Sequence, residues 1–255
     1  MTPVWAIASN SIREAMRNRV FLSLTGFALA MVGCSFLLTE VQHSIYDRIL
    51  VDAGLGAMSI FGALLAMLLG ISQVNREIER RTVYNVVSKP IRRAHFVVGK
   101  YLGLCLVLTA NLLAMLVVFL LVAKLWRVDL RLVYLTAFVG ILVETYFLVA
   151  VATFFSTFCS TVTATFFTLS TYVIGHLSGD LKFFGSRTKS ELVQTASAFL
   201  YRVLPNLEAL NFKTQASYAE PVSAQELGLA VGYAAIYVVA LMTAASTVFA
   251  RRDFR

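Results

Sequence analysis

Few residues of this sequence combine the type and spacing that enzyme chemistry needs. The pair Gly99-Lys100 is followed by a tyrosine and has no glycine five positions earlier, so the phosphate-binding pattern G-x-x-x-x-G-K-[ST] is absent. His176 stands in no Gly-x-Ser-x-Gly turn that would present a nucleophile. The three histidines lie in separate polar regions, and the three cysteines show no zinc or disulfide spacing. We therefore predict no catalytic residue, no metal site and no cofactor bound directly by this chain.

Glu144 carries the sharpest chemical signal, because it lies in the middle of a long apolar run. A carboxyl group near the centre of a bilayer costs roughly 2.5–3.5 kcal/mol on insertion scales, so it should face protein or a water-filled cavity. One interpretation is a gating or substrate-path group that takes part in turnover. The other is a protonated or hydrogen-bonded residue that joins helices, with Asn111 or Thr145 as its partner. The sequence leaves both interpretations open.

The stretch Asn75–Lys100 is the long, strongly basic segment of the chain, with seven of the 22 Lys and Arg. It is too polar to cross lipid and too long for a bare turn, since helix connections usually have about 2–8 residues. A solvated loop that only sets topology is one interpretation. The apolar residues within Arg76–Ser88 favour a surface helix, broken before Pro90, and hence a docking surface.

The composition predicts a polytopic, all-α membrane protein. Of 255 residues, 58% are hydrophobic and only 14% charged, whereas soluble domains carry about 25% charged residues. Because a span needs about 20 apolar residues, we predict one transmembrane domain over 1–255 with six spans, at 20–38, 53–71, 102–122, 132–155, 161–177 and 227–250. The second span contains small residues that let helices approach closely, namely Gly54, Gly56, Gly62 and Gly70.

Two amphipathic stretches flank or interrupt the spans. Residues 3–18 combine an aliphatic stripe and Trp5 with basic residues, which predicts a helix in the membrane interface. The hydrophilic segment 178–226 includes a predicted helix with an apolar face containing Leu192, Phe199 and Leu200. We expect this face to pack on the outer ends of the spans or on an extracytoplasmic partner. Ser223 and Glu226 predict a capping box that starts the last span.

The charges set the orientation. Six spans put both termini on the side of Asn75–Lys100, and that side holds 13 Lys and Arg against 4 Asp and Glu. The short loops on the other side hold 4 against 4, and the segment 178–226 holds 5 against 5. The positive-inside rule therefore places both termini in the cytoplasm. The net charge of +8 is a topology signal, and we predict no nucleic-acid partner.

Several motifs resemble the ABC-2 type transporter permeases. Glu77-Ile-Glu79-Arg-Arg-Thr82, then Ser88-Lys-Pro90-Ile-Arg-Arg93, then Gly99-Lys100 is similar to the first cytoplasmic loop of that family, and Phe249-Ala-Arg-Arg-Asp253-Phe is similar to its usual ending. Leu50-Val-Asp52-Ala-Gly54-Leu, Phe155-Ser-Thr-Phe, Tyr172-Val-Ile-Gly-His176-Leu-Ser and Leu204-Pro-Asn206-Leu resemble the branch named for multicopper-enzyme maturation. Together they cover nearly the whole chain.

The resemblance implies a division of labour. Two permease chains, a homodimer rather than a heterodimer, would join two ABC ATP-binding subunits that bind ATP and Mg, in a bacterial inner membrane. Residues 3–18 would be the elbow helix, and 75–100 would contain the coupling helix that receives the force of ATP hydrolysis. The expected ATPase-coupling residues are Arg76, Glu77, Glu79, Arg80, Arg81, Thr82, Pro90, Arg92 and Arg93.

Two rival classes remain beside an exporter or force-transmitting permease. A stand-alone secondary transporter or channel often shows internal repeats and charge-lined helices, but the two halves show no repeat and Glu144 is the one charge in mid-span. A membrane anchor would use the 178–226 surface for an extracytoplasmic partner. Scattered Cys and Met residues do not favour copper as cargo, and the sequence points to no single substrate class.

Overall fold

The computed structural model describes residues 3–34, 46–79, 93–188, 194–195 and 205–251, and the regular elements in these ranges are all helices. This agrees with the predicted all-α class. The helices are α1 (Pro3–Met16), α2 (Arg19–Cys34), α3 (Tyr46–Glu79), α5 (Arg93–Leu125), α6 (Leu132–Ser156), α7 (Thr161–Arg187), η2 (Glu208–Leu210), α9 (Lys213–Tyr218) and α10 (Ala224–Arg251).

Within the described ranges, four helices are long and apolar enough to cross a membrane: Asp47–Ser72, Ala94–Leu125, Leu132–Ser156 and Ala224–Ala250. They contain the predicted spans 53–71, 102–122, 132–155 and 227–250. The other two predicted spans correspond to α2, which has 16 residues, and to the first part of α7. The chain therefore has several helices that could cross a membrane, as a multi-pass membrane protein does. The total of six spans remains a prediction.

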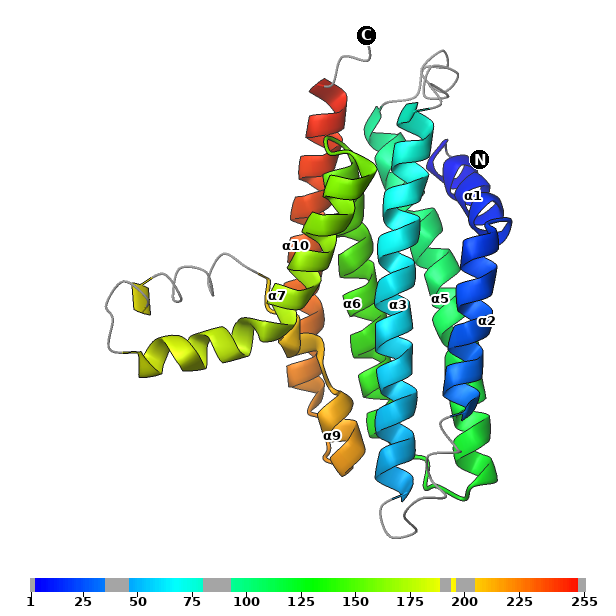
Figure 1. The fold of residues 1–255 in the computed structure, drawn as a ribbon, viewed down its shortest axis with the longest axis vertical. Helices are drawn as coiled ribbons and strands as arrows, with labels where there is room; N and C mark the ends of the chain where they lie inside the picture. The colour runs from blue at the N-terminus through cyan, green and yellow to red at the C-terminus, as the bar shows by residue number, and fades with distance from the viewer. Residues whose placement is uncertain (1–2, 35–45, 80–92, 189–193, 196–204, 252–255) are drawn as a thin grey trace.

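The long helices form one bundle, with α3 and α6 packed along each other at its centre (Figure 1). Glycines on α3 permit close packing on both neighbouring helices: a methyl group on Gly70 would lie 2.7 Å from Ala152 of α6, and one on Gly54 would lie 2.5 Å from a ring carbon of Phe119 of α5. The predicted role of these glycines is confirmed there, although Gly56 has no neighbour within 4 Å. Because lipid provides no hydrophobic drive between helices, such close contacts carry the association.

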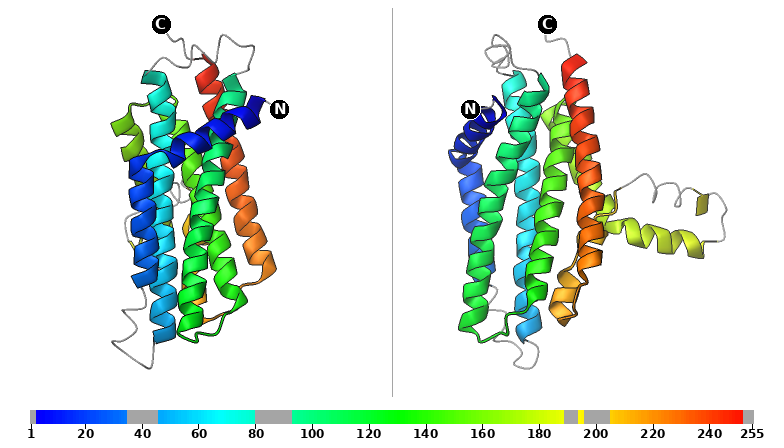
Figure 2. Two further views of the ribbon diagram at one scale, coloured as in Figure 1. Left: turned by 90° about the vertical axis from the view of Figure 1, so that its right-hand side faces the viewer. Right: turned by 180° about the vertical axis from the view of Figure 1, so that it is seen from behind.

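Helix α1 lies across the bundle near one end (Figure 2) and packs on α5. Gly103 permits the approach, since a methyl group there would meet the Ala8 carbonyl oxygen at 2.7 Å. The ammonium of Lys100, which is 1% exposed, lies 3.1 Å from the Glu14 carboxylate. The prediction that Lys100 lies in water is wrong, because α1 covers its side chain and Glu14 compensates its charge.

The polar segment overlaps two long helices, because α3 continues to Glu79 and α5 begins at Arg93. Residues 76–79 of the predicted surface helix therefore belong to α3, and the rest of that helix, with its break before Pro90, lies outside the described residues. Among the expected coupling residues, Arg76, Glu77, Glu79 and Arg93 stand at these helix ends. The others lie outside the described residues: Arg80, Arg81, Thr82, Pro90 and Arg92.

The same end of the bundle holds the start of α1, the end of α3, the start of α5 and the end of α10 (Figure 1). This arrangement matches the predicted sharing of one side by the two termini and the basic segment. The predicted capping box of α10 is also confirmed, because the Glu226 amide donates to Ser223 Oγ at 3.1 Å and the Ser223 amide donates to Glu226 Oε2 at 3.2 Å.

The segment before the last helix departs from the prediction. Helix α7 runs ten residues past its predicted end at Leu177, to Arg187, and its last part points away from the bundle (Figures 1 and 2). Residues 205–219, here called the return segment, then fold back onto the bundle and belong to its core through Leu207, Leu210, Phe212 and Ala216. Residues Leu192, Phe199 and Leu200 of the predicted outer helix lie outside the described residues.

Candidate functional site

Glu144 is buried in α6, with 2% of its surface exposed, and its partner comes from α7. Its Oε1 atom lies 2.8 Å from Nε2 of His176. The two partners suggested by the sequence bond elsewhere: Asn111 Nδ2 donates to Thr25 Oγ1 at 2.7 Å, and Thr145 Oγ1 donates to the Ile141 carbonyl at 2.8 Å. Glu144 thus joins α6 to α7.

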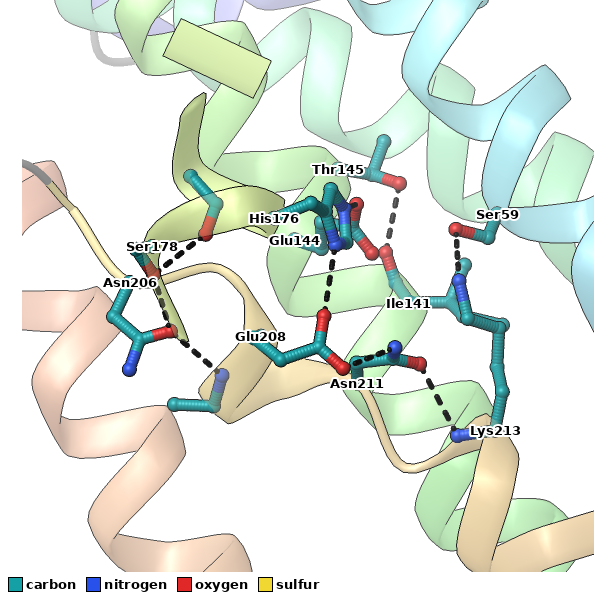
Figure 3. A network of polar contacts seen from close by, with 12 residues as sticks. Ser59, Ile141, Glu144, Thr145, His176, Ser178, Asn206, Glu208, Asn211 and Lys213 are labelled. Carbon is teal, nitrogen blue, oxygen red and sulfur yellow. Dashed lines mark hydrogen bonds and ion pairs between the residues drawn. The ribbon is translucent and has the colours of Figure 1, made fainter. Parts of the chain in front are cut away.

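His176 connects this buried carboxylate to a second one on the return segment (Figure 3). Its Nδ1 lies 3.2 Å from Glu208 Oε2, and Asn211 Nδ2 donates to Glu208 Oε1 at 2.8 Å. A neutral imidazole has one N–H, whereas an imidazolium has two and can donate to both carboxylates at once. The geometry therefore fits a charged His176 between Glu144 and Glu208, with its ring steeply inclined to that of Tyr172 in a T-shaped contact.

A backbone carbonyl of α7, one residue before His176, binds the return segment. The Gly175 carbonyl accepts from the Leu207 amide at 3.1 Å and from Ser178 Oγ at 2.9 Å. Only glycine leaves room here, because a methyl group on Gly175 would lie 2.7 Å from Leu207. A side chain that inserts into the hydrogen-bond ladder of a helix is a common cause of kinks. The two donors at the Gly175 carbonyl therefore account for the bend after which the last part of α7 points away from the bundle (Figures 1 and 2).

The rest of the return segment is fastened to the first half of α3. Lys213 Nζ donates to Ser59 Oγ at 2.9 Å, and Ser217 Oγ donates to Asp52 Oδ1 at 2.9 Å. The Arg48 guanidinium lies 3.6 Å above the ring of Tyr218, a cation–π contact. Helix α9 has only six residues, so its position depends on these contacts rather than on intrinsic helix stability.

An open cavity of about 440 Å³ lies beside Glu208, between the return segment and α10. Its lining mixes two carboxylates with amides and rings: Glu208, Asn211, Phe212, Gln215, Glu226 and Tyr233. Glu208 is 46% exposed here, whereas the Glu144 side chain is 3% exposed. The polar chain Glu208–His176–Glu144 therefore runs from an open cavity to a buried carboxylate.

The bond from His176 lowers the pKa of Glu208 below its ordinary value of 4.5, with help from Asn211 and Lys213. The pKa of Glu208 is lower in the folded chain than in the unfolded chain, so the interaction stabilises the fold above about pH 4.5. This stabilisation is lost as the pH falls through the lowered pKa. We expect acid to loosen the return segment over that range, by a modest amount since Glu208 is half exposed. Hydrogen exchange of residues 205–219 at pH 3 to 6 measures this, and Glu208→Gln should remove the dependence.

These groups can hold and exchange protons, but they do not form a nucleophilic centre, since the described partners of both His176 ring nitrogens are carboxylates and not a serine, threonine or cysteine that could donate to the imidazole. Among the described residues, no three His, Cys, Asp or Glu side chains are arranged to hold a metal ion. The chemistry that the geometry supports is therefore charge pairing and proton exchange between helices.

The sequence pointed to Glu144 but not to its surroundings. His176 and Asn206 appear only in motifs that carry other arguments, and no pattern marks Glu208, Lys213 or Ser59. Two general signals bear on the partner of Glu144: a mid-span carboxyl group requires a partner, and His176 ends an apolar run. Neither signal could select His176 over Asn111, because the choice depends on which helices are neighbours.

No curated protein matches the chain. The family model described as "ABC-2 family transporter protein" matches residues 5–254, which is nearly the whole chain. This match agrees with the long apolar helices and with the motifs of the basic segment. The chain therefore belongs to the ABC-2 family of transporter proteins, as a multi-pass membrane permease subunit that works with ABC ATP-binding subunits.

Proposed function

We propose that two copies of this chain form the membrane part of a bacterial inner-membrane ABC exporter or force-transmitting complex, with both termini cytoplasmic. Two separate ATPase subunits bind ATP and Mg and dock on the segment 75–100. The chain itself hydrolyses no ATP. We also propose that the chain belongs to the branch named for multicopper-enzyme maturation. The candidate classes of cargo for the complex are lipid, polysaccharide, peptide, drug and metal complex.

One observation carries the proposal: the basic segment joins the ends of the two longest helices. Helices α3 and α5 have 34 and 33 residues, so each is about 50 Å long at 1.5 Å per residue. A push on the segment would act along both helices at once. Through α3 it would reach α6, and through α5 it would reach α1, which Lys100 and Glu14 fasten to α5.

The proposal is tested by reversing charges in the segment. Glu77→Lys, Glu79→Lys and Arg92→Glu should each reduce copurification of the ATPase subunit, by roughly tenfold for a loss of about 1.4 kcal/mol, while the permease still inserts. Arg127→Glu is the matched control, because Arg127 is an exposed residue between α5 and α6 at the other end of the bundle. Retention of the ATPase by all three variants would count against docking at this segment.

A further inference from the structure

We propose that Glu144, His176 and Glu208 form a proton-binding site whose occupancy holds the return segment on the bundle. This role goes beyond ATPase-driven transport and needs no second subunit. The protonated state is the closed one: the imidazolium donates to Glu144 from Nε2 and to Glu208 from Nδ1. Each bond joins His176 to a different element, so one proton controls a contact between α6, α7 and the return segment.

The consequence of losing the proton follows from burial. A neutral imidazole keeps one N–H, so one carboxylate then faces a nitrogen lone pair instead of a donor. If that carboxylate is Glu144, a buried charge loses its partner, which is strongly unfavourable. If it is Glu208, the return segment loses its bond to α7.

The charged and titratable neighbours of His176 come from every element packed against it. Glu144 comes from α6, Tyr172 from α7 itself, Glu208 from η2 and Lys213 from α9, and the α3 side chain bonded to Lys213 is the non-titrating Ser59. Lys213 opposes the imidazolium, but its ammonium is bonded to Ser59 Oγ at 2.9 Å. The two carboxylates at 2.8 and 3.2 Å therefore dominate the field at the imidazole.

The site also has an entrance and a moving part. Glu208 lines the open cavity beside α10, so protons reach His176 from that side. The return segment rests on α6 and α7 at two glycines, where Leu210 covers Gly140 and Leu207 covers Gly175. Release of the His176–Glu208 bond would therefore expose the apolar residues of the return segment, above all Leu210, which is 1% exposed.

The test measures how well Leu210 is covered as a function of pH. Cys34, Cys105 and Cys159 are replaced by alanine in the full chain, and Leu210→Cys is labelled with a water-soluble maleimide in nanodiscs between pH 6 and 9. Asp129→Cys, exposed between α5 and α6, is labelled in parallel, and the ratio of the two rates removes most of the pH dependence of the thiol. If the closed state binds the proton tenfold more tightly than the open state does, this ratio should rise about tenfold as the pH rises through the transition.

Two variants separate a proton site from a merely structural bond. His176→Gln should give a high ratio that no longer changes with pH. Glu144→Gln should move the transition to lower pH, because the imidazolium loses its buried counter-charge. A pH-independent ratio with native His176, or the native profile in His176→Gln, would overturn the proposal.

Hydrogen exchange of residues 205–219 in the chain with its native Leu210 provides an independent readout, in case Leu210→Cys itself loosens the segment. Exchange corrected for intrinsic rates should rise over the same pH range in the native chain and should stay flat in His176→Gln. Equal protection of the two chains at every pH would contradict the inference. Neither experiment involves the ATPase, so failure here leaves docking at 75–100 untouched.

Discussion

Replacing His176 by alanine is expected to lower the free energy of unfolding by about 3 kcal/mol, because breaking a buried ion pair leaves an uncompensated charge. The partner left behind is Glu144, with 3% of its side chain exposed. Unfolding in mixed detergent micelles, followed by circular dichroism at neutral pH, measures the change. The effect should be larger than for Glu208→Gln, since Glu208 is 46% exposed and can be solvated.

The control for this variant removes the stranded charge as well. In the double variant His176→Ala with Glu144→Gln, the neutral amide needs less compensation than a carboxylate, so part of the lost stability should return. The double-mutant cycle isolates the pair from the cavity that the alanine creates. Additive effects of the two single variants would show that Glu144 and His176 do not stabilise each other.

Replacing Gly140 by leucine is expected to detach the return segment from α6. Any Cβ at Gly140 would overlap the Leu210 carbonyl oxygen and would lie 2.9 Å from the Phe212 ring. Overpacking a site of this kind costs about 1–3 kcal/mol, and the backbone oxygen cannot rotate away as a flexible side chain could. The free energy of unfolding should fall, and so should the protection of residues 205–219 from hydrogen exchange.

Gly232→Leu provides the matched control for Gly140→Leu. It makes the same change in helix α10, at a position where a Cβ would meet nothing within 4 Å. Leucine also has the higher helix propensity, so this variant should fold at least as well as the native chain. If both variants behaved alike, the close approach at Gly140 would not be what holds the return segment.

The helical class and the location of four long apolar helices could be predicted from the sequence, because the cost of placing a residue in lipid depends mainly on its own chemistry. The ends of these helices could not. Helix α3 continues through charged residues to Glu79, since backbone hydrogen bonding does not stop where the apolar run stops. Likewise, Lys100 is polar by type and yet buried, because Glu14, 86 positions earlier, lies against it.

The candidate site, like the fold, could be predicted from the sequence only in part. The residue types are enough to show that Glu144 is costly in lipid and needs a partner, and that a basic segment separates two long apolar runs. The identity of the partner depends on the folded chain: it is His176, 32 positions away, and Glu208, a further 32 positions on, lies on the other side of the imidazole. These pairings depend on Gly140 and Gly175, where the absence of a side chain lets the return segment reach the bundle. Such contacts between distant segments arise from packing in three dimensions, and no local pattern of residues contains them.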